Sequence, residues 1–270
     1  MIDDLVEAIR NRRAILFAGA GISMSVGLPS WRTLIEHMGE ELGLPADNFA
    51  SPETNYFTLA EYYRLQQGSI GPLRSWMDRN WTISEENLKR SRVHELIVAL
   101  DFPIIYTTNF DRNLEASFQL RGKKFTKVTN AKDLARVQDG ITQIIKFHGD
   151  FDEDQSLVLA ETDYFKRLAF DSPLDVKFQA DALAKTVLFV GYSLSDLDIR
   201  LILYRLWQRW AESGYEKDRP KSFVFMIRPS PLEAAVLEHW GISAINDDTN
   251  DPENALEVFL EKLKKAVADP

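Results

Sequence analysis

Residues Ala14–Ala18 read AILFA and run directly into Gly19-Ala20-Gly21-Ile22-Ser23. An apolar run of five residues without alternation is typical of a parallel strand that is buried on both faces. Two glycines one residue apart after such a strand allow a tight turn and let a pyrophosphate approach the backbone closely. The third glycine of the dinucleotide fingerprint is missing, because Met24 occupies its place. The stretch therefore predicts a strand and a partial nucleotide-binding loop, with a plain glycine-rich turn as the alternative.

The rest of the chain repeats this strand signal at intervals that leave room for crossover helices. Five further strands are predicted, at Pro103–Thr107, Gln143–Phe147, Thr186–Val190, Ser222–Ile227 and Ile242–Ile245. Helices are predicted at Leu174–Lys185, Asp198–Glu212 and Pro252–Val267. This alternation predicts an α/β fold, with a doubly wound, Rossmann-like parallel sheet between two layers of helices.

One interval is too long for a simple crossover. About eighty residues separate the first strand from Pro103, where a dozen or so would suffice, and they are helical in character and rich in aromatic residues. We interpret residues 49–100 as a small helical module inserted into a Rossmann-like domain of residues 1–48 and 101–270. Most of its aromatic side chains are expected to pack its own core. Its position after the glycine loop also suits a lid or an assembly surface.

Composition excludes several classes of function. The net charge is −9, and the acidic balance disfavours direct nucleic-acid binding. The chain has no cysteine, which removes thiolate zinc sites and cysteine nucleophiles. The four histidines, His37, His94, His148 and His239, are far apart in sequence and form no local metal motif. With no apolar run of membrane-spanning length and no secretory signal, we expect a cytoplasmic protein without membrane contact.

The glycine loop is followed by Gly27-Leu28-Pro29-Ser30-Trp31-Arg32. Together the two segments resemble the NAD loop of the sirtuin family, whose second segment reads glycine, hydrophobic, proline, aspartate, phenylalanine, arginine. Here Ser30 and Trp31 replace the aspartate and the phenylalanine, whereas Arg32 is kept. Its planar guanidinium suits a bidentate phosphate contact, with an ordinary surface arginine as the alternative. The resemblance implies these NAD-binding residues: Gly19, Ala20, Gly21, Ser23 and Arg32.

Three further segments follow in the family's order, each where a predicted strand ends. Thr107–Asp111 (TTNFD) resembles the threonine–glutamine–asparagine–isoleucine–aspartate motif, with threonine in place of glutamine. Phe147–Gly149 resembles the segment that carries the catalytic histidine, and Gly191–Ser193 resembles a turn that contacts the nucleotide. Ligands of open α/β sheets bind outside the carboxyl ends of the strands. The resemblance implies catalytic roles for Asn109 and His148. It also implies four binding residues: Thr108, Asp111, Gly191 and Ser193.

The chemistry of these residues leaves alternatives. The amide of Asn109 can hold a ribose hydroxyl or a water, or it can end the strand as a turn residue. The imidazole of His148 can accept a proton near neutral pH, so that the rate should fall as the pH drops through its pKa; a buried structural histidine is the alternative. Asp111 can bind a ligand or cap the following helix. Ser195 and Asp198 are expected to form a helix capping box.

The departures from the family point to one of its branches. Sirtuin deacetylases carry a four-cysteine zinc ribbon that shapes the peptide cleft, and this chain has no counterpart. The remaining NAD site and Asn–His pair resemble the sirtuin-like NADase domains of bacterial anti-phage defence proteins. That resemblance implies metal-free hydrolysis of the nicotinamide–ribose bond of NAD by an NAD-depleting effector. A sirtuin-type deacylase or ADP-ribosyltransferase is one alternative, and a non-catalytic subunit that senses NAD or ADP-ribose is another.

An unrestrained NADase would be toxic to its own cell. We therefore expect control from outside the chain. The resemblance implies homo-oligomers, and a protein partner such as an ATPase or another defence subunit. No residue identifies that partner.

Overall fold

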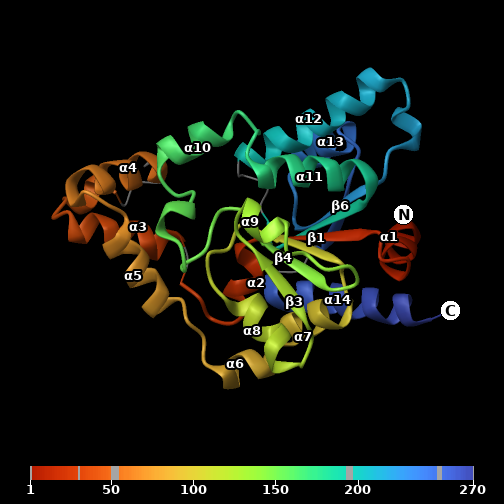
Figure 1. Ribbon diagram of the computed structural model, residues 1–270, viewed down its shortest axis with the longest axis horizontal. Coiled ribbons are helices and arrows are strands. Elements are labelled where there is room, and N and C mark those ends of the chain that lie inside the picture. The colour runs from red at the N-terminus through yellow and green to blue at the C-terminus, as the bar shows by residue number, and fades with distance from the viewer. Residues whose placement is uncertain (1, 30, 50–54, 193–196, 248–250, 270) are drawn as a thin grey trace.

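A parallel sheet forms the centre of the protein and confirms the predicted Rossmann-like, doubly wound α/β fold (Figure 1). The computed structural model describes residues 2–29, 31–49, 55–192, 197–247 and 251–269. These residues form a seven-stranded sheet in the order β3-β4-β2-β1-β5-β6-β7, in which every neighbouring pair is parallel. The strands are β1 Ala14–Ala18, β2 Ile104–Thr107, β3 Phe125–Val128, β4 Thr142–Lys146, β5 Thr186–Val190, β6 Ser222–Ile227 and β7 Ile242–Asp247.

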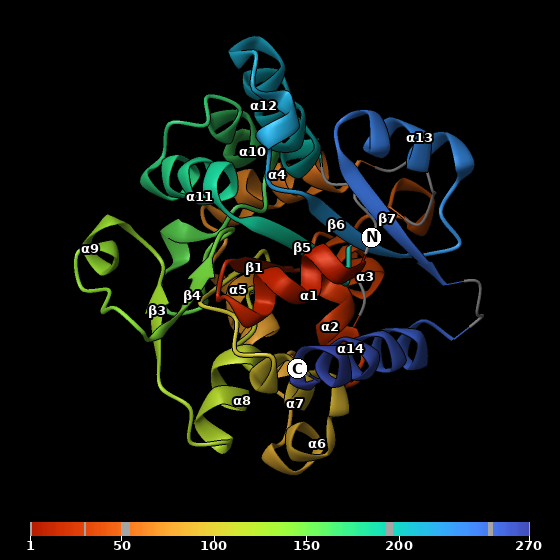
Figure 2. The ribbon, with the colours of Figure 1, turned by 90° about the vertical axis from the view of Figure 1, so that its right-hand side faces the viewer.

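The central strand β1 is apolar throughout because both of its faces are covered. Leu16 and Ala18 belong to one hydrophobic core, whereas Ile15 and Phe17 belong to the core on the opposite face. Figure 2 shows the two helical layers on either side of the sheet. The first core is closed by α1 Ile2–Arg10, α7 Arg92–Ala99, α8 Asn113–Leu120 and α14 Pro252–Ala268. The second is closed by α11 Pro173–Ala184, α12 Leu197–Ser213 and α13 Pro231–His239.

A third hydrophobic core docks α3 and the first helices of the insertion onto the ends of the strands. Its buried side chains come from α3 (Trp31–Glu41), α4 (Tyr56–Gln67) and α5 (Gly71–Asn80). They also include Phe110 and Phe151, which follow β2 and β4. Figure 1 shows α3, α4 and α5 together on the side of the molecule opposite α1. The carboxyl ends of β2 and β4 therefore contact the helices of the insertion.

The remaining helices connect these layers. They are α2 Ala20–Met24, α6 Glu85–Arg90, α9 Ala131–Leu134 and α10 Glu161–Arg167, with 3-10 turns at Ala46–Asn48, Asp154–Ser156 and Glu216–Asp218. Helix α3 packs with α4 and α5, and α7 packs on the sheet. The division into 1–48 and 101–270 with an insertion of 49–100 stays a prediction. In the described ranges no helix is both long and apolar enough to cross a membrane.

The strand at one edge of the sheet was not predicted. Strand β3 has the sequence FTKV, and three of its four residues are only half-buried. Its polar residues Thr126 and Lys127 interrupt the apolar pattern that identifies the inner strands, as an edge position permits. The last strand also extends two residues beyond its predicted end, to Asp247.

Candidate active site

The glycine loop is held against the loop that follows β5 by direct contact between backbones. The amide of Gly19 donates to the carbonyl oxygen of Val190 at 2.9 Å, and that of Gly21 donates to Gly191 at 3.0 Å. A Cβ atom on Gly21 would lie only 2.8 Å from the Cα of Gly191, so a side chain there would separate the loops. Gly191 itself has φ +66°, which favours glycine. The glycines therefore permit a close loop-to-loop contact as well as a tight turn.

Four neighbouring strands deliver the sequence-predicted residues to one pocket. Strands β4, β2, β1 and β5 are adjacent in the sheet, and their carboxyl ends lie at the same edge. Seven predicted residues line this pocket: Ala20, Ser23, Thr108, Asn109, Asp111, His148 and Gly191. The structure thus brings together segments that lie far apart in the sequence, as the rule for ligand sites in open sheets predicts.

Asn109 is tied to the glycine loop through its side chain. It is buried, and its Nδ2 donates to the carbonyl oxygen of Gly19 and to Oγ of Ser23, both at 3.0 Å. The backbone amide of Asn109 donates to Oγ1 of Thr107 at 3.1 Å. Since both hydrogens of Nδ2 are used, the amide oxygen is the atom left to accept a hydrogen bond from a ligand.

Asp111 fixes the same region by two bonds. Its Oδ2 accepts from Oγ of Ser23 at 2.8 Å, and its Oδ1 accepts from the amide of Asn113 at 2.9 Å, at the start of α8. Asp111 thus contacts the first residue of α8, but the N-cap position belongs to Arg112, whose side chain makes no capping bond. Beside it, the hydroxyl groups of Thr108 and Tyr192 are hydrogen-bonded to each other. Asp111 therefore fixes the side chain of Ser23, a residue of the pocket wall.

His148 is buried at the end of β4, with 3% of its surface exposed. Burial lowers the pKa of His148 well below its ordinary value of 6.5, and the positive charge of Arg167 lowers it further. Arg167 is held nearby, since it donates to the carbonyl oxygen of Phe147 and to Asp175. Among the described residues, Nε2 of His148 has no hydrogen-bond partner. A neutral imidazole with a free nitrogen at a pocket wall can accept a proton.

Three described residues of the predicted binding set do not line the pocket: Gly19, Gly21 and Arg32. The side chain of Arg32 is 73% exposed, and its Nε donates to Oε1 of Glu36 at 3.0 Å, one turn further along α3. Its phosphate contact stays a prediction. Ser193 lies outside the described residues, as do Ser195 and the side chain of Asp198, so the predicted capping box is not described. Gly19 and Gly21 support the wall through their backbones.

Sequence reasoning missed an aromatic lining. Six rings line the pocket besides the polar residues: Trp31, Tyr56, Trp81, Phe110, Tyr164 and Tyr192. Tyr56 and Trp81 belong to the insertion, where we expected aromatic residues to pack an internal core. Trp31 stacks on Tyr56 with ring centroids 6.2 Å apart, and Tyr164 meets the edge of His148 at 5.7 Å. Three of the six, Trp31, Phe110 and Tyr192, lie inside the recognised motifs and so carried a sequence signal.

Within the part of the chain that the structure describes, no three histidine, aspartate or glutamate side chains are grouped as a metal ion would require.

The sheet order and the strand-end pocket define a Rossmann-like protein of the class that binds ligands at the carboxyl edge of the sheet. The sequence pattern of the SIR2-like domain family matches residues 103–245, more than half of the chain, and the protein belongs to that family. A crystal structure of a Sir2 homolog–NAD complex has the same fold, with a TM-score of 0.52 and 12% identity, over 99% of this chain and 96% of that one.

Relatives of known name are bacterial. The chain is 31% identical to the NAD(+) hydrolase ThsA of Bacillus cereus (strain MSX-D12), covering 86% of this chain and 48% of the relative. It is 34% identical to the ThsA of Enterococcus faecium, covering 78% and 43%. It is 27% identical to defense-associated sirtuin 2 of Bacillus subtilis, covering 88% and 23%. The chain thus spans about half of these relatives' length, or less.

Proposed function

We propose that this protein hydrolyses NAD at the bond between nicotinamide and ribose. The observation that carries the proposal is the pocket in which Asn109 and His148 lie beside the glycine loop, at the ends of adjacent strands. Membership of the SIR2-like family supports it, as do similar proteins that are named NAD(+) hydrolases.

The reaction requires little covalent chemistry from the protein. The C1′–N bond breaks and nicotinamide leaves with the bonding electron pair as a neutral pyridine. The transition state then resembles the oxocarbenium ion of glycoside hydrolysis. A water oxygen bonds to C1′, and the water loses one proton, so that the products are ADP-ribose, nicotinamide and a proton. Positioning of the ribose and the water supplies most of the acceleration.

The two polar side chains take separate roles in this scheme. The free amide oxygen of Asn109 accepts a hydrogen bond from the ribose or from the attacking water, because its nitrogen is already bound to the glycine loop. The free Nε2 of His148 accepts the proton of the water or of a ribose hydroxyl. The aromatic side chains around them exclude bulk water from the reacting bond, which strengthens both hydrogen bonds.

We further propose that the protein acts in the bacterial cytoplasm as an NAD-depleting effector of anti-phage defence, held in check by homo-oligomerisation or by a protein partner. The relationship to a defense-associated sirtuin supports the setting. An enzyme that consumes NAD must be restrained in its own cell, and this need supports the proposed control by homo-oligomerisation or by a protein partner. A strict monomer in solution that hydrolyses NAD rapidly without any addition would contradict the control.

The direct test measures nicotinamide release from NAD by the purified protein. Asn109→Ala and His148→Ala should abolish release, whereas the exposed His239→Ala, as a matched control, should not. Full activity of either pocket variant would refute the mechanism. Release that depends on an acylated peptide or another acceptor would indicate a deacylase or transferase. Binding of ADP-ribose by calorimetry without product over hours would indicate a sensing subunit.

A further inference from the structure

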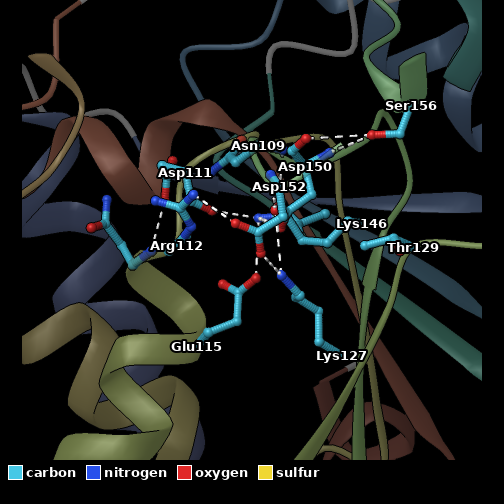
Figure 3. Close-up of polar contacts among 12 residues, drawn as sticks. Asn109, Asp111, Arg112, Glu115, Lys127, Thr129, Lys146, Asp150, Asp152 and Ser156 are labelled. Atoms are coloured by element: carbon cyan, nitrogen blue, oxygen red, sulfur yellow. Dashed lines mark hydrogen bonds and ion pairs between the residues drawn. The ribbon is translucent and has the colours of Figure 1, made fainter. Parts of the chain in front are cut away.

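The side chain of one lysine, Lys146, is buried next to the candidate site. Lys146 is the last residue of β4, two positions before His148, and it is 1% exposed. A buried ammonium group is costly unless it is paired and hydrogen-bonded. Its Nζ donates to the main-chain oxygen of Asp111 and lies 3.3 Å from Oε1 of Glu115 and 3.8 Å from Oδ2 of Asp150 (Figure 3).

These partners belong to both segments that carry the candidate catalytic residues. Asp111 lies two positions after Asn109, and Asp150 lies two positions after His148. The amine of Lys146 is therefore hydrogen-bonded to the loop after β2, and it also lies within ion-pair distance of the carboxylate of Asp150 in the loop after β4, whose Oδ2 accepts no hydrogen bond from the described residues. Neither Lys146 nor Asp150 is among the described residues that line the pocket, so any effect on a ligand passes through the loops.

Asp150 is fixed from the other side as well. Its amide donates to Oγ of Ser156 at 3.0 Å, and its Oδ1 accepts from the amide of Asp152 at 2.8 Å. That same oxygen lies 3.3 Å from Nζ of Lys127 on the edge strand β3. Asp150 is thus held by Ser156, Asp152 and Lys127, and its Oδ2 adds an ion pair to the hydrogen bond by which Lys146 ties β4 to the loop of Asn109.

We propose that Lys146 is a positioning residue that sets the spacing between Asn109 and His148, through its hydrogen bond to Asp111 and, in second place, its ion pair with Asp150. The proposal rests on the proposed NAD hydrolysis. It assigns no contact with NAD to either residue. Because the amide oxygen of Asn109 and Nε2 of His148 must both reach the reacting ribose and water, a shift of one loop against the other separates two groups that act together.

Glu115 provides the means to test positioning apart from charge balance. It lies on α8, is buried, and its carboxylate oxygens accept no hydrogen bond from the described residues. Burial raises the pKa of Glu115, while the charge of Lys146 opposes that rise. Glu115 therefore balances the charge of Lys146 without holding either loop. Glu115→Gln removes the balancing charge and keeps the tie between the loops.

The experiment compares Glu115→Gln with the double variant Lys146→Met/Glu115→Gln in the full chain. The double variant removes the charges of Lys146 and Glu115 together, and Asp150 keeps its pairing with Lys127. We expect the double variant to fold, with a kcat for nicotinamide release roughly 100-fold lower, the scale of a misplacement of about 1 Å, and with an unchanged KM for NAD. Glu115→Gln should retain near-normal turnover.

Hydrogen exchange supplies a readout that does not need turnover. In the double variant, amides of residues 108–111 and 147–150 should exchange roughly tenfold faster or more, while those of β1 and α14 should stay as protected as before. Equal kcat in the two variants with unchanged exchange in both loops would overturn the proposal, and so would uniformly faster exchange throughout the sheet. If the wild-type protein releases no nicotinamide, the two variants cannot be compared by kcat, and the exchange comparison alone decides whether Lys146 ties the loops.

Discussion

At the scale of single residues, the burial of His148 changes the expected pH dependence. The sequence alone predicts a base that titrates near neutrality. In the structure, burial first and Arg167 second hold the pKa of His148 well below 6.5, so the imidazole is neutral at physiological pH. The neutral form is the base, and activity is lost only when acid protonates it.

We therefore predict that the rate of nicotinamide release is independent of pH from about 6.5 upward, since the lowered pKa of His148 moves the acid limb of the pH profile below the ordinary pKa of histidine. Initial rates measured from pH 4.5 to 8 check this. Arg167→Gln removes the positive charge that helps to lower the pKa of His148, so the acid limb of the pH profile should move to higher pH. A wild-type limb centred at or above 6.5 would show that His148 is not the titrating base.

Ser23 is a second residue whose effect can be predicted. Its hydroxyl donates to Asp111 and accepts from Asn109, and it is buried. Ser23→Ala leaves a buried donor and a buried acceptor without their partner, which should destabilise the fold by about 1–3 kcal/mol. It should also lower kcat, because Asn109 loses one of the two bonds that orient it. Urea denaturation and steady-state kinetics measure the two effects.

Ser25→Ala is the matched control for that substitution. Ser25 lies on the same short segment, but its hydroxyl donates only to the carbonyl oxygen of Ile22, at 2.6 Å. Its removal should leave kcat unchanged. If Ser23→Ala also leaves kcat unchanged, Asn109 does not need the hydroxyl for its orientation.

At the scale of elements, the inserted helices are tied to the segment that follows His148. Arg64 on α4 pairs with Asp163 at 2.8 Å, and Arg74 on α5 pairs with Asp154 at 2.6 Å. Both partners lie between His148 and Tyr164 in the sequence, and Asp163 directly precedes Tyr164, which lines the pocket. A lid or control role for the insertion remains a prediction, and these ion pairs are the contacts through which it would act.

The double variant Arg64→Gln/Arg74→Gln should loosen this connection. Partly exposed pairs contribute only about 0.2–1 kcal/mol each, so the fold should persist. We expect faster hydrogen exchange in α4 and α5 and a higher KM for NAD, because Tyr56 and Tyr164 lose their fixed position. Arg90→Gln, which breaks a pair with Glu86 within α6, serves as the control. Unchanged exchange in α4 and α5 would show that the ion pairs do not hold the insertion.

The elements also show what a sequence can predict. Inner strands such as β1 and β5 were predicted residue for residue, because burial on both faces demands an unbroken apolar run. Strand β3 lacks that demand at the sheet edge. The pocket residues that follow inner strands were predictable for the same reason. Tyr56 and Trp81 were not, because their place depends on how the third core docks, which no local pattern encodes.

At the scale of the whole molecule, acid should destabilise the fold before most carboxylates titrate. Burial first, and then the charge of Arg121, lower the pKa of His94 to about 4. The unfolded chain, with an ordinary histidine pKa near 6.5, binds the proton more readily, so stability is constant above that value and falls as the pH drops toward 4. From pH 7 to 5 His94 should contribute about 2 kcal/mol to this loss.

His148 contributes with the same sign, whereas the raised pKa of Glu115 acts in the opposite direction above pH 4.5. A comparison of variants therefore isolates His94. In His94→Gln, the drop in unfolding free energy between pH 7 and 5 should be smaller than in the wild type. Chemical denaturation at both values measures it, with His239→Gln, at an exposed position, as the control. An identical drop in His94→Gln and the wild type would contradict the prediction.

The interleaved strand order also sets when the site can exist during synthesis on the ribosome. The glycine loop follows β1, near the start of the chain, but its amides need the carbonyl groups of Val190 and Gly191. Strand β1 lacks one of its two neighbours until β5 has been made. A nascent chain that already contains Asn109 and His148 therefore still lacks the contact between the glycine loop and the loop after β5 that completes the pocket. The site therefore closes only after the ribosome has released residue 191, well after Asn109 and His148 have been made.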